Sequence, residues 1–221
     1  MQILAALSVQ EQCFCPILDT RSRRINCIRH WISVPVSYTH LFSKEDKIII
    51  SVGLFIERKG ILDFVELAKQ MPEYQFIWFG YTNLNTVPRK IRQAVQTKLP
   101  NLHFPGYVSR EELIDAYCGS DLFFFPTYEE TEGIVLLEAF AIKIPVVVRD
   151  IPIYKKWVPD KIAAYKGKNN LEFKYMIRGI LEGRLPSTVE KGYEIAEERS
   201  IDKIGKKLVA VYRVALQRTQ P

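Results

Sequence analysis

The stretch DKIIISVGLFIERKGILDFVELAKQM (residues 46–71) changes its hydrophobic pattern halfway along. Its first part, DKIIISVGLF at 46–55, is a short run rich in Ile and Val, typical of a strand covered on both faces. After the loop GLFIERKG, apolar residues recur at helical spacing, at Ile61, Phe64, Val65 and Ala68. Pro72 then stops the helix. The stretch therefore predicts a buried strand, a glycine-bounded loop and an amphipathic helix.

The same unit repeats along the chain. Further strands are predicted at 74–80, 101–106, 121–127, 145–150 and 161–166, and helices at 87–99, 109–120, 133–143 and 170–183, with more helix between 186 and 218. Ser109 and Glu112 form a capping box at one helix start. Short apolar strands that alternate with helices indicate right-handed βαβ units. The predicted fold class is α/β, a Rossmann-like parallel sheet with helices on both faces.

The chain changes character near residue 42. Residues 1–41 have poor hydrophobic periodicity and are interpreted as an irregular segment. Two interpretations stay open for it: non-native sequence, since VSYTHL resembles translated sequencing-adapter junctions, or the remnant of an N-terminal segment. Residues 42–221 are expected to form one domain.

Composition narrows the function classes. With 48% hydrophobic and 25% charged residues the chain is an ordinary globular protein. No apolar run reaches the ~20 residues of a membrane span, and the N-terminus lacks a secretory pattern, so a cytoplasmic protein is expected. The net charge of +6 suggests anionic partners. Nucleic acid is not expected, since basic and aromatic residues do not interleave on the strands.

Metal binding is not expected either. Cys13, Cys15, Cys27 and His30 imitate a zinc site, but zinc sites usually use paired C-x2–4-C knuckles. We expect neither a metal nor another cofactor.

Three loops follow the first, second and fourth predicted strands: GLFIERKG, GYTN and PTYEETEG. In open parallel sheets, ligands bind beyond the carboxyl ends of the strands. Gly53 lets the first loop turn closely. Arg58 and Lys59 precede a helix start, where cations and free N–H groups suit a diphosphate. A plain surface Arg-Lys pair explains the same residues, and the loop is not a Walker A motif.

The stretch PTYEETEGIVLLEAF (126–140) is the most informative. We expect its helix to begin near Glu132, with Gly133 leaving room for a ligand at the first turn. Glu130 lies in the loop before it, and Glu138 stands inside an aliphatic run. The alternative is that the early acids complement the helix dipole and Glu138 lies at a solvent edge.

Glu130 and Glu138 form an E-x7-E pair within P-T-x-x-E-x-x-G-x-x-x-L-E-A. This pattern resembles the signature of retaining GT-B glycosyltransferases of family 4. The resemblance covers residues 47–215 in order and includes WFG, FPGYVSREELIDAY and PVVVRDIP. The pairing of YEETEGIVLLEAFA with VRDIPIY is particularly similar to bacterial diacylglycerol glucosyltransferases.

The resemblance implies a role for each matching residue. Glu138 would accept hydrogen bonds from the ribose hydroxyls, and Glu130 would lie at the donor sugar. Backbone N–H groups of Thr131, Glu132 and Gly133 would meet the sugar or its phosphate. Lys59 and Arg58 would offset the diphosphate charge without a metal. The backbone of Tyr107 and Val108 would read the base, expected to be uracil.

Some positions depart from the family pattern. Leu54 stands where many relatives have Arg, Lys143 or Ile144 where a Gly is common, and Thr131 to Gly133 where G-F-G is usual. The first departure leaves the phosphate contacts to Lys59 and Arg58.

The implied protein transfers a hexose, expected to be glucose, from a UDP-sugar to a diacylglycerol-type lipid. Residues 1–41 are too short for the acceptor domain of such an enzyme, so we expect residues 42–221 to be a donor-binding half with doubtful activity by itself. The alternatives are a non-catalytic nucleotide-sugar-binding or partner subunit and a GT-B-type UDP-sugar epimerase. The cluster YKKW (154–157) suits a lipid headgroup interface and suggests peripheral contact at the inner face of the cell membrane.

Overall fold

The structure is a computed structural model that describes residues 45–218. In this part of the chain the strands are β1 (Ile48–Val52), β2 (Gln75–Phe79), β3 (Leu102–Gly106), β4 (Leu122–Phe125), β5 (Val146–Arg149) and β6 (Tyr165–Gly167). The helices are α3 (Ile61–Gln70), α4 (Arg89–Val95), α5 (Arg110–Gly119), α6 (Ile134–Ala141), α7 (Asn170–Leu181), α8 (Val189–Glu198) and α9 (Ile201–Arg218). Two 3-10 helices, η1 (Glu57–Lys59) and η2 (Pro152–Lys156), follow β1 and β5. The interpretations placed on residues 1–41 lie outside the described residues.

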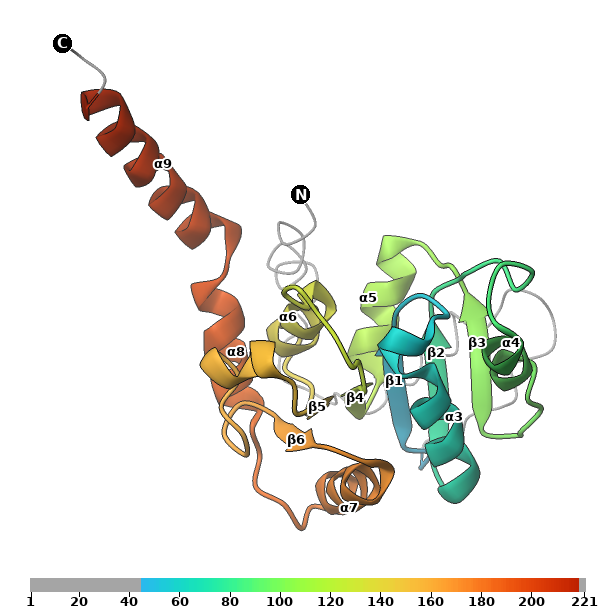
Figure 1. Cartoon of the computed structure of the whole chain (residues 1–221). Coiled ribbons are helices and arrows are strands. Elements are labelled where there is room, and N and C mark those ends of the chain that lie inside the picture. Colours follow the sequence, from blue (N-terminus) through green and yellow to red (C-terminus); the bar gives the residue numbers. More distant parts are fainter. Residues whose placement is uncertain (1–44, 219–221) are drawn as a thin grey trace.

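The strands form one sheet in the order β3-β2-β1-β4-β5-β6. Every neighbouring pair is parallel, which confirms the predicted α/β class (Figure 1). The chain order reverses between β1 and β4, so their carboxyl ends border the crevice where such sheets bind ligands.

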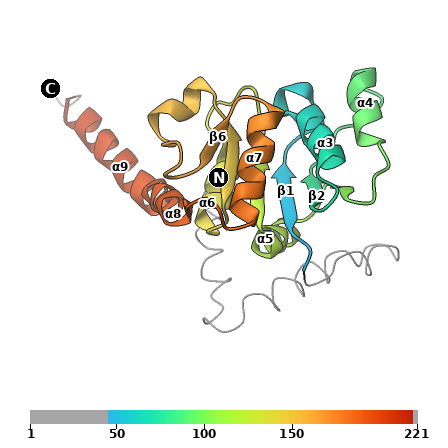
Figure 2. The same cartoon turned by 90° about the horizontal axis from the view of Figure 1, so that it is seen from below.

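Alternate strand residues face two separate cores, as the pleat requires. Ile49 and Phe124 pack with α3, α4 and α7, whereas Phe123 and Phe125 pack with α5, α6 and α8. Figure 2 shows α3 and α7 on one side of the sheet and α5 on the other. Both faces are therefore covered, which explains why the strands are almost wholly apolar.

Several predicted boundaries differ from the observed ones. The helix predicted at 87–99, for example, is α4 and ends at Val95. The last strand was expected at 161–166, but β6 begins at Tyr165. Lys161 has φ 59°, and its N–H donates to the Ala164 carbonyl, so this segment is a turn before the strand. The helix expected to begin near Glu132 begins at Ile134. The capping box at Ser109 and Glu112 is confirmed.

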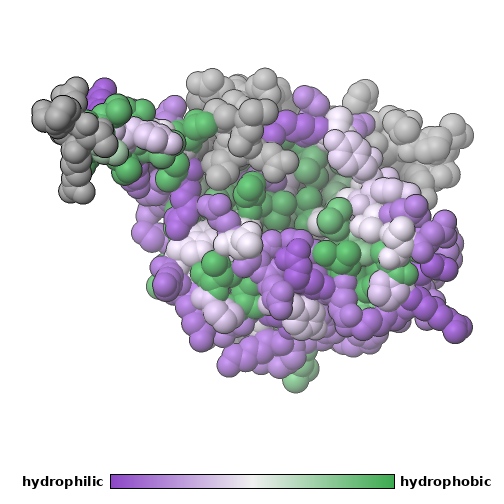
Figure 3. Space-filling view, turned by 45° about the horizontal axis from the view of Figure 1, so that its top comes forward, coloured by the Kyte–Doolittle hydropathy of each residue, from purple (hydrophilic) through white to green (hydrophobic). Residues whose placement is uncertain are grey.

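Helix α9 projects away from the sheet in both ribbon views. Apolar side chains on it are exposed, and they appear as green atoms on the projecting arm in Figure 3. They are Ile204, Leu208, Val209, Val211, Tyr212, Val214 and Leu216. No helix among residues 45–218 combines the length and the hydrophobicity needed to cross a membrane.

Candidate functional site

Two loops meet at the crevice between β1 and β4. The Arg58 carbonyl accepts hydrogen bonds from the Tyr128 N–H at 2.8 Å and from the Thr127 hydroxyl at 3.2 Å. The Arg58 guanidinium in turn donates to the Glu129 carbonyl at 3.1 Å. These bonds bring together two of the three loops that the sequence marked as ligand-binding.

The close approach of the loops depends on Gly60. This residue has φ 79°, and a Cβ built on it would lie 2.4 Å from the Pro126 carbonyl oxygen. Only glycine fits such a contact without moving backbone. The third marked loop joins the site's rim, since the Phe55 N–H donates to the Thr82 hydroxyl at 2.9 Å.

Lys59 and Glu130 form the central ion pair of the site. The Lys59 ammonium lies 2.6 Å and 2.8 Å from the two oxygens of the Glu130 carboxylate. Their side chains are 15% and 9% exposed, so the pair is largely shielded from water. The Lys59 stem packs against Gly53, whose added Cβ would lie 3.5 Å from the Lys59 Cγ. The structure thus joins three predicted site residues in one cluster.

Helix α6 begins beside this pair. Gly133 is its N-cap, with φ 84°, and the first helical turn contains no acidic residue. Helix N-termini leave backbone N–H groups without intrahelical partners and carry a partial positive charge. Thr131 and Glu132 are exposed just before the cap. Glu132 therefore lies outside the helix rather than in its first turn, where the sequence had placed it.

Glu138 is half-buried on α6. Its carboxylate accepts a hydrogen bond from the Tyr117 hydroxyl at 3.3 Å. Burial raises the pKa of the Glu138 carboxyl, while the Tyr117 hydrogen bond and the charge of Arg110 partly offset that rise. A carboxylate in this setting is fixed in place and able to accept further hydrogen bonds.

Tyr154 reaches the same region from η2. Its side chain is fully buried, and its hydroxyl has no hydrogen-bond partner among the described residues. A Cβ added to Gly133 would lie 2.9 Å from this hydroxyl. Burial, and then the negative charge of Glu130, raise the pKa of the Tyr154 hydroxyl. The prediction of a surface role for Tyr154, as part of YKKW, is wrong, because the η2 turn directs its ring into the core.

The other three residues of YKKW differ in their exposure to solvent. Lys155 and Lys156 are exposed, whereas Trp157 is partly buried under the Arg199 guanidinium, 4.5 Å from its ring centre. Only the two lysines are therefore free to face an anionic surface.

Tyr107 and Val108 lie farther from the central pair. They follow β3, two strands away from β1 in the sheet. The Tyr107 side chain is 85% exposed, and Val108 packs against the core on the α5 side. The preceding Gly106 has φ 86° and open space around it. Their predicted contact is through backbone, which is consistent with an exposed tyrosine.

Arg149 was missed by the sequence analysis. It is 6% exposed and donates to the carbonyls of Pro126 and Lys168 and to the Asp63 carboxylate. Its guanidinium also lies 3.8 Å from the ring centre of Tyr128. Arg149 therefore ties β5 to the loop that carries Glu130. A cation at the end of the run PVVV was the signal available in the sequence.

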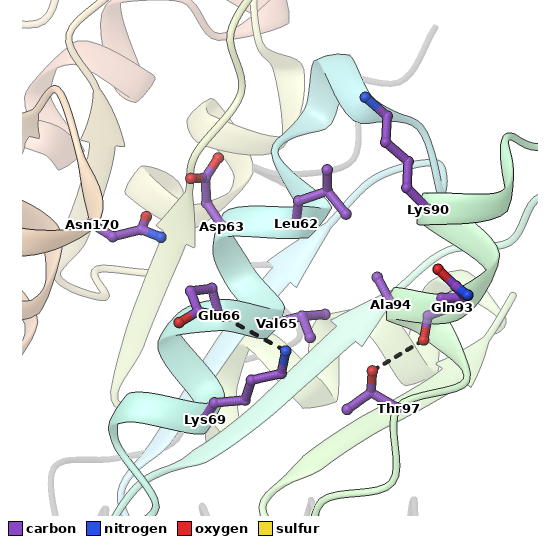
Figure 4. A pocket seen from close by; sticks show the side chains of 10 residues that line it. All are labelled: Leu62, Asp63, Val65, Glu66, Lys69, Lys90, Gln93, Ala94, Thr97 and Asn170. Carbon is purple, nitrogen blue, oxygen red and sulfur yellow. Dashed lines mark hydrogen bonds and ion pairs between the residues drawn. The ribbon is translucent and has the colours of Figure 1, made fainter.

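A groove of about 450 Å³ lies between α3 and α4, with Asn170 at one end (Figure 4). Polar side chains within it engage local partners, such as Glu66 with Lys69 and Thr97 with the Gln93 carbonyl. None of the predicted site residues lines this groove, so it is separate from the candidate site.

No group of three or more His, Cys, Asp or Glu residues within 45–218 is arranged to hold a metal ion. The imitation zinc set of Cys13, Cys15, Cys27 and His30 lies outside the described residues.

Known proteins resemble this chain in sequence and in fold. A family model described as glycosyl transferases group 1 matches residues 38–197. The chain is 45% identical over 171 residues to a processive diacylglycerol alpha-glucosyltransferase of Acholeplasma laidlawii, covering 77% of this chain and 52% of that protein. It is 30% identical over 156 residues to an alpha-galactosylglucosyldiacylglycerol synthase of Streptococcus pneumoniae, covering 69% and 42%.

Among solved structures, Anabaena HepE in complex with UDP-glucose shares the fold, with a TM-score of 0.70 at 15% identity. The match covers 86% of this chain and 52% of that one. The chain spans about half the length of the curated relatives it matches.

Proposed function

Since the chain belongs to the glycosyl transferases group 1 family, we propose that residues 45–218 bind the nucleotide-sugar donor of a retaining glycosyltransferase. The donor is UDP-glucose and the acceptor a diacylglycerol-type lipid. The relative with 45% identity bears the name of a diacylglycerol alpha-glucosyltransferase, which supports this choice of sugar and lipid.

One observation carries the proposal. Lys59 and Glu130 pair beside the N-terminus of α6, and Glu138 lies half-buried on the same helix. A cation and a helix N-terminus suit a diphosphate, and a fixed carboxylate can accept hydrogen bonds from the hydroxyls of a ribose. The cation and the helix N-terminus lie at the carboxyl edge of the sheet, where the fold binds ligands, and Glu138 follows in the helix that begins there.

Each residue then has a defined task. Lys59, assisted by Arg58, stabilises the negative charge that develops on the diphosphate as its bond to the sugar carbon breaks. The N–H groups of Thr131, Glu132 and Gly133 face the sugar or its phosphate, and Glu130 binds the sugar. We propose that this cationic stabilisation serves in place of a bound metal.

The remaining donor contacts are at the nucleoside. Glu138 accepts hydrogen bonds from the ribose hydroxyls, and the backbone of Tyr107 and Val108, with the turn at Gly53 keeping the site open, binds uracil. These assignments follow the family pattern, and the exposed position of Tyr107, beside the partly buried Gly106 at the carboxyl edge, supports them.

We further propose that the lipid acceptor is bound by a part of the protein outside residues 45–218. The acceptor would be reached at the inner face of the cell membrane. The exposed Lys155 and Lys156 are available for contact with anionic lipid there.

The proposal is tested by titrating the 221-residue chain with UDP, UDP-glucose and ADP-glucose in a calorimeter. We expect the uridine nucleotides to bind and ADP-glucose to bind more weakly. Glu138→Ala should weaken UDP binding about tenfold or more, because hydrogen bonds to a charged group contribute about 1.5–3 kcal/mol. Glu129→Ala, which removes an exposed carboxylate from the neighbouring loop, is the matched control and should leave the affinity unchanged. Unchanged UDP affinity in Glu138→Ala would refute the ribose assignment.

A further inference from the structure

The hydroxyl of Tyr154 is a buried donor that makes no hydrogen bond among the described residues. Leaving a buried polar group unpaired is unfavourable, so such a group in a folded protein calls for an explanation. The ring is fully buried and stands edge-on to Trp157, with ring centres 5.6 Å apart. The Tyr154 carbonyl accepts from the Lys166 ammonium at 3.0 Å. The ring of Tyr154 is thus held in place.

Glu130 is the charged group beside that hydroxyl. The point where a Cβ on Gly133 would stand lies 2.9 Å from the Tyr154 hydroxyl and 3.4 Å from the Glu130 Cγ. Glu130 is carried on the loop between β4 and α6 and is 9% exposed. In the structure both of its oxygens accept from Lys59, and neither hydrogen-bonds the Tyr154 hydroxyl.

A diphosphate competes for the same lysine. Its phosphates carry more negative charge than one carboxylate and attract the Lys59 ammonium more strongly. Glu130 would then hold a nearly buried negative charge without its cation, which is unfavourable unless another donor replaces it. A rotation of the Glu130 side chain would bring its carboxylate to the Tyr154 hydroxyl. This hydroxyl is a donor without a partner among the described residues.

We propose that Tyr154 is a positioning residue for Glu130. When the donor diphosphate draws Lys59 away, the Tyr154 hydroxyl donates a hydrogen bond to the Glu130 carboxylate and holds it toward the sugar. This inference rests on the proposed function, which places the diphosphate at Lys59 and the sugar at Glu130.

The test is a double-mutant cycle in the 221-residue chain with Tyr154→Phe, Glu130→Ala and the double variant. Affinity for UDP-glucose is measured by calorimetry, and thermal unfolding is measured without nucleotide. Tyr154→Phe removes only the unpaired hydroxyl, so the melting temperature should not fall. The affinity should fall about tenfold or more, as expected for one hydrogen bond to a charged group. In the Glu130→Ala background the same change should alter affinity by less than about twofold.

Tyr165→Phe is the matched control. Tyr165 is also buried, but its hydroxyl donates to the Pro186 carbonyl at 3.0 Å, outside the site. This variant should lower the melting temperature and leave the affinity unchanged. UDP is titrated against the same set of variants. A variant that binds UDP-glucose too weakly to measure then still gives a coupling energy from the UDP affinities.

Two results would overturn the inference while the proposed function stands. One is a wild-type chain that binds UDP-glucose with an affinity that Tyr154→Phe does not change. The other is an equal loss in the presence and absence of Glu130, which would mean that the hydroxyl acts independently of it. A wild-type chain that binds neither UDP nor UDP-glucose would instead refute the proposed function and the inference with it.

Discussion

The ammonium of Lys59 lies 2.6 Å and 2.8 Å from the two carboxylate oxygens of Glu130, a residue 71 positions farther along the chain. The pair joins the loop after β1 to the loop after β4. Because both side chains are at most 15% exposed, water screens the attraction only weakly. Removing one partner would therefore leave the other charge largely buried.

Replacing Lys59 should reduce both stability and nucleotide binding. We expect Lys59→Met to lower the free energy of unfolding by about 2 kcal/mol, because the Glu130 charge is left without its partner. UDP affinity should fall about tenfold or more, since the proposed charge-assisted contact of Lys59 with the diphosphate is lost. Urea unfolding and calorimetry measure the two effects.

Lys90→Met is the control for the Lys59 variant. Lys90 pairs with Glu57 in η1, but both side chains are more than half exposed. Surface pairs of this kind contribute about 0.5 kcal/mol or less. Equal losses of stability in the two variants would show that the burial of the Lys59 pair is unimportant.

Stability should depend on pH through Glu138. Burial raises the pKa of this carboxyl in the folded protein above its usual value of 4.5. Between the unfolded and folded pKa values, the native state binds more protons than the unfolded state, so stability falls as pH rises through that window. Glu138→Gln does not titrate. Its stability advantage over wild type should grow as pH rises from 4.5 and become constant above the folded pKa.

Tyr117→Phe provides the check on this pH dependence. The Tyr117 hydroxyl lowers the pKa of Glu138 by hydrogen bonding to the charged form. Removing it should extend the pH-dependent window to higher pH. A stability difference between wild type and Glu138→Gln that is flat from pH 4 upward would contradict the assignment.

Gly133 should be less replaceable than another glycine of similar conformation. Gly133 and Gly183 have φ 84° and 72°, but only at Gly133 would an added Cβ meet a side chain, the Tyr154 hydroxyl. We expect Gly183→Ala to cost about 1 kcal/mol from backbone conformation alone. Gly133→Ala should cost about 2–3 kcal/mol and weaken UDP-glucose binding. Similar unfolding midpoints in urea for the two variants would argue against the contact.

Arg149 should be needed for the shape of the site rather than for binding. Its guanidinium bonds the carbonyls of Pro126 and Lys168 and the carboxylate of Asp63, and a lysine cannot make these three bonds at once. Arg149→Lys should lower the free energy of unfolding by about 3 kcal/mol. Arg178→Lys, at an exposed pair with Glu73, should change it by about 0.5 kcal/mol or less. Denaturation in urea distinguishes the two.

Much of the fold was predictable because strands and helices have local signatures. The apolar runs at β1, β4 and β5 are buried on both faces, and their Ile, Val and Phe content shows it directly. The turn at Lys161 was harder to predict, since KIAAYK is as apolar as a strand and only its backbone conformation excludes one. The start of α6 was misplaced because Glu132 is a common residue in a first turn, while Gly133 in the left-handed region is the actual cap.

The sequence by itself determined the parallel sheet, the three loops that follow its first, second and fourth strands, and the set of residues on them, since hydrophobic period and loop composition are properties of nearby residues. Only the tertiary structure decided which of those residues meet. The pairing of Lys59 with Glu130, the bonds from Arg149 and the burial of Tyr154 beside Gly133 join segments far apart in the chain. Such contacts depend on the order of the strands and the packing of their loops, which no local pattern encodes.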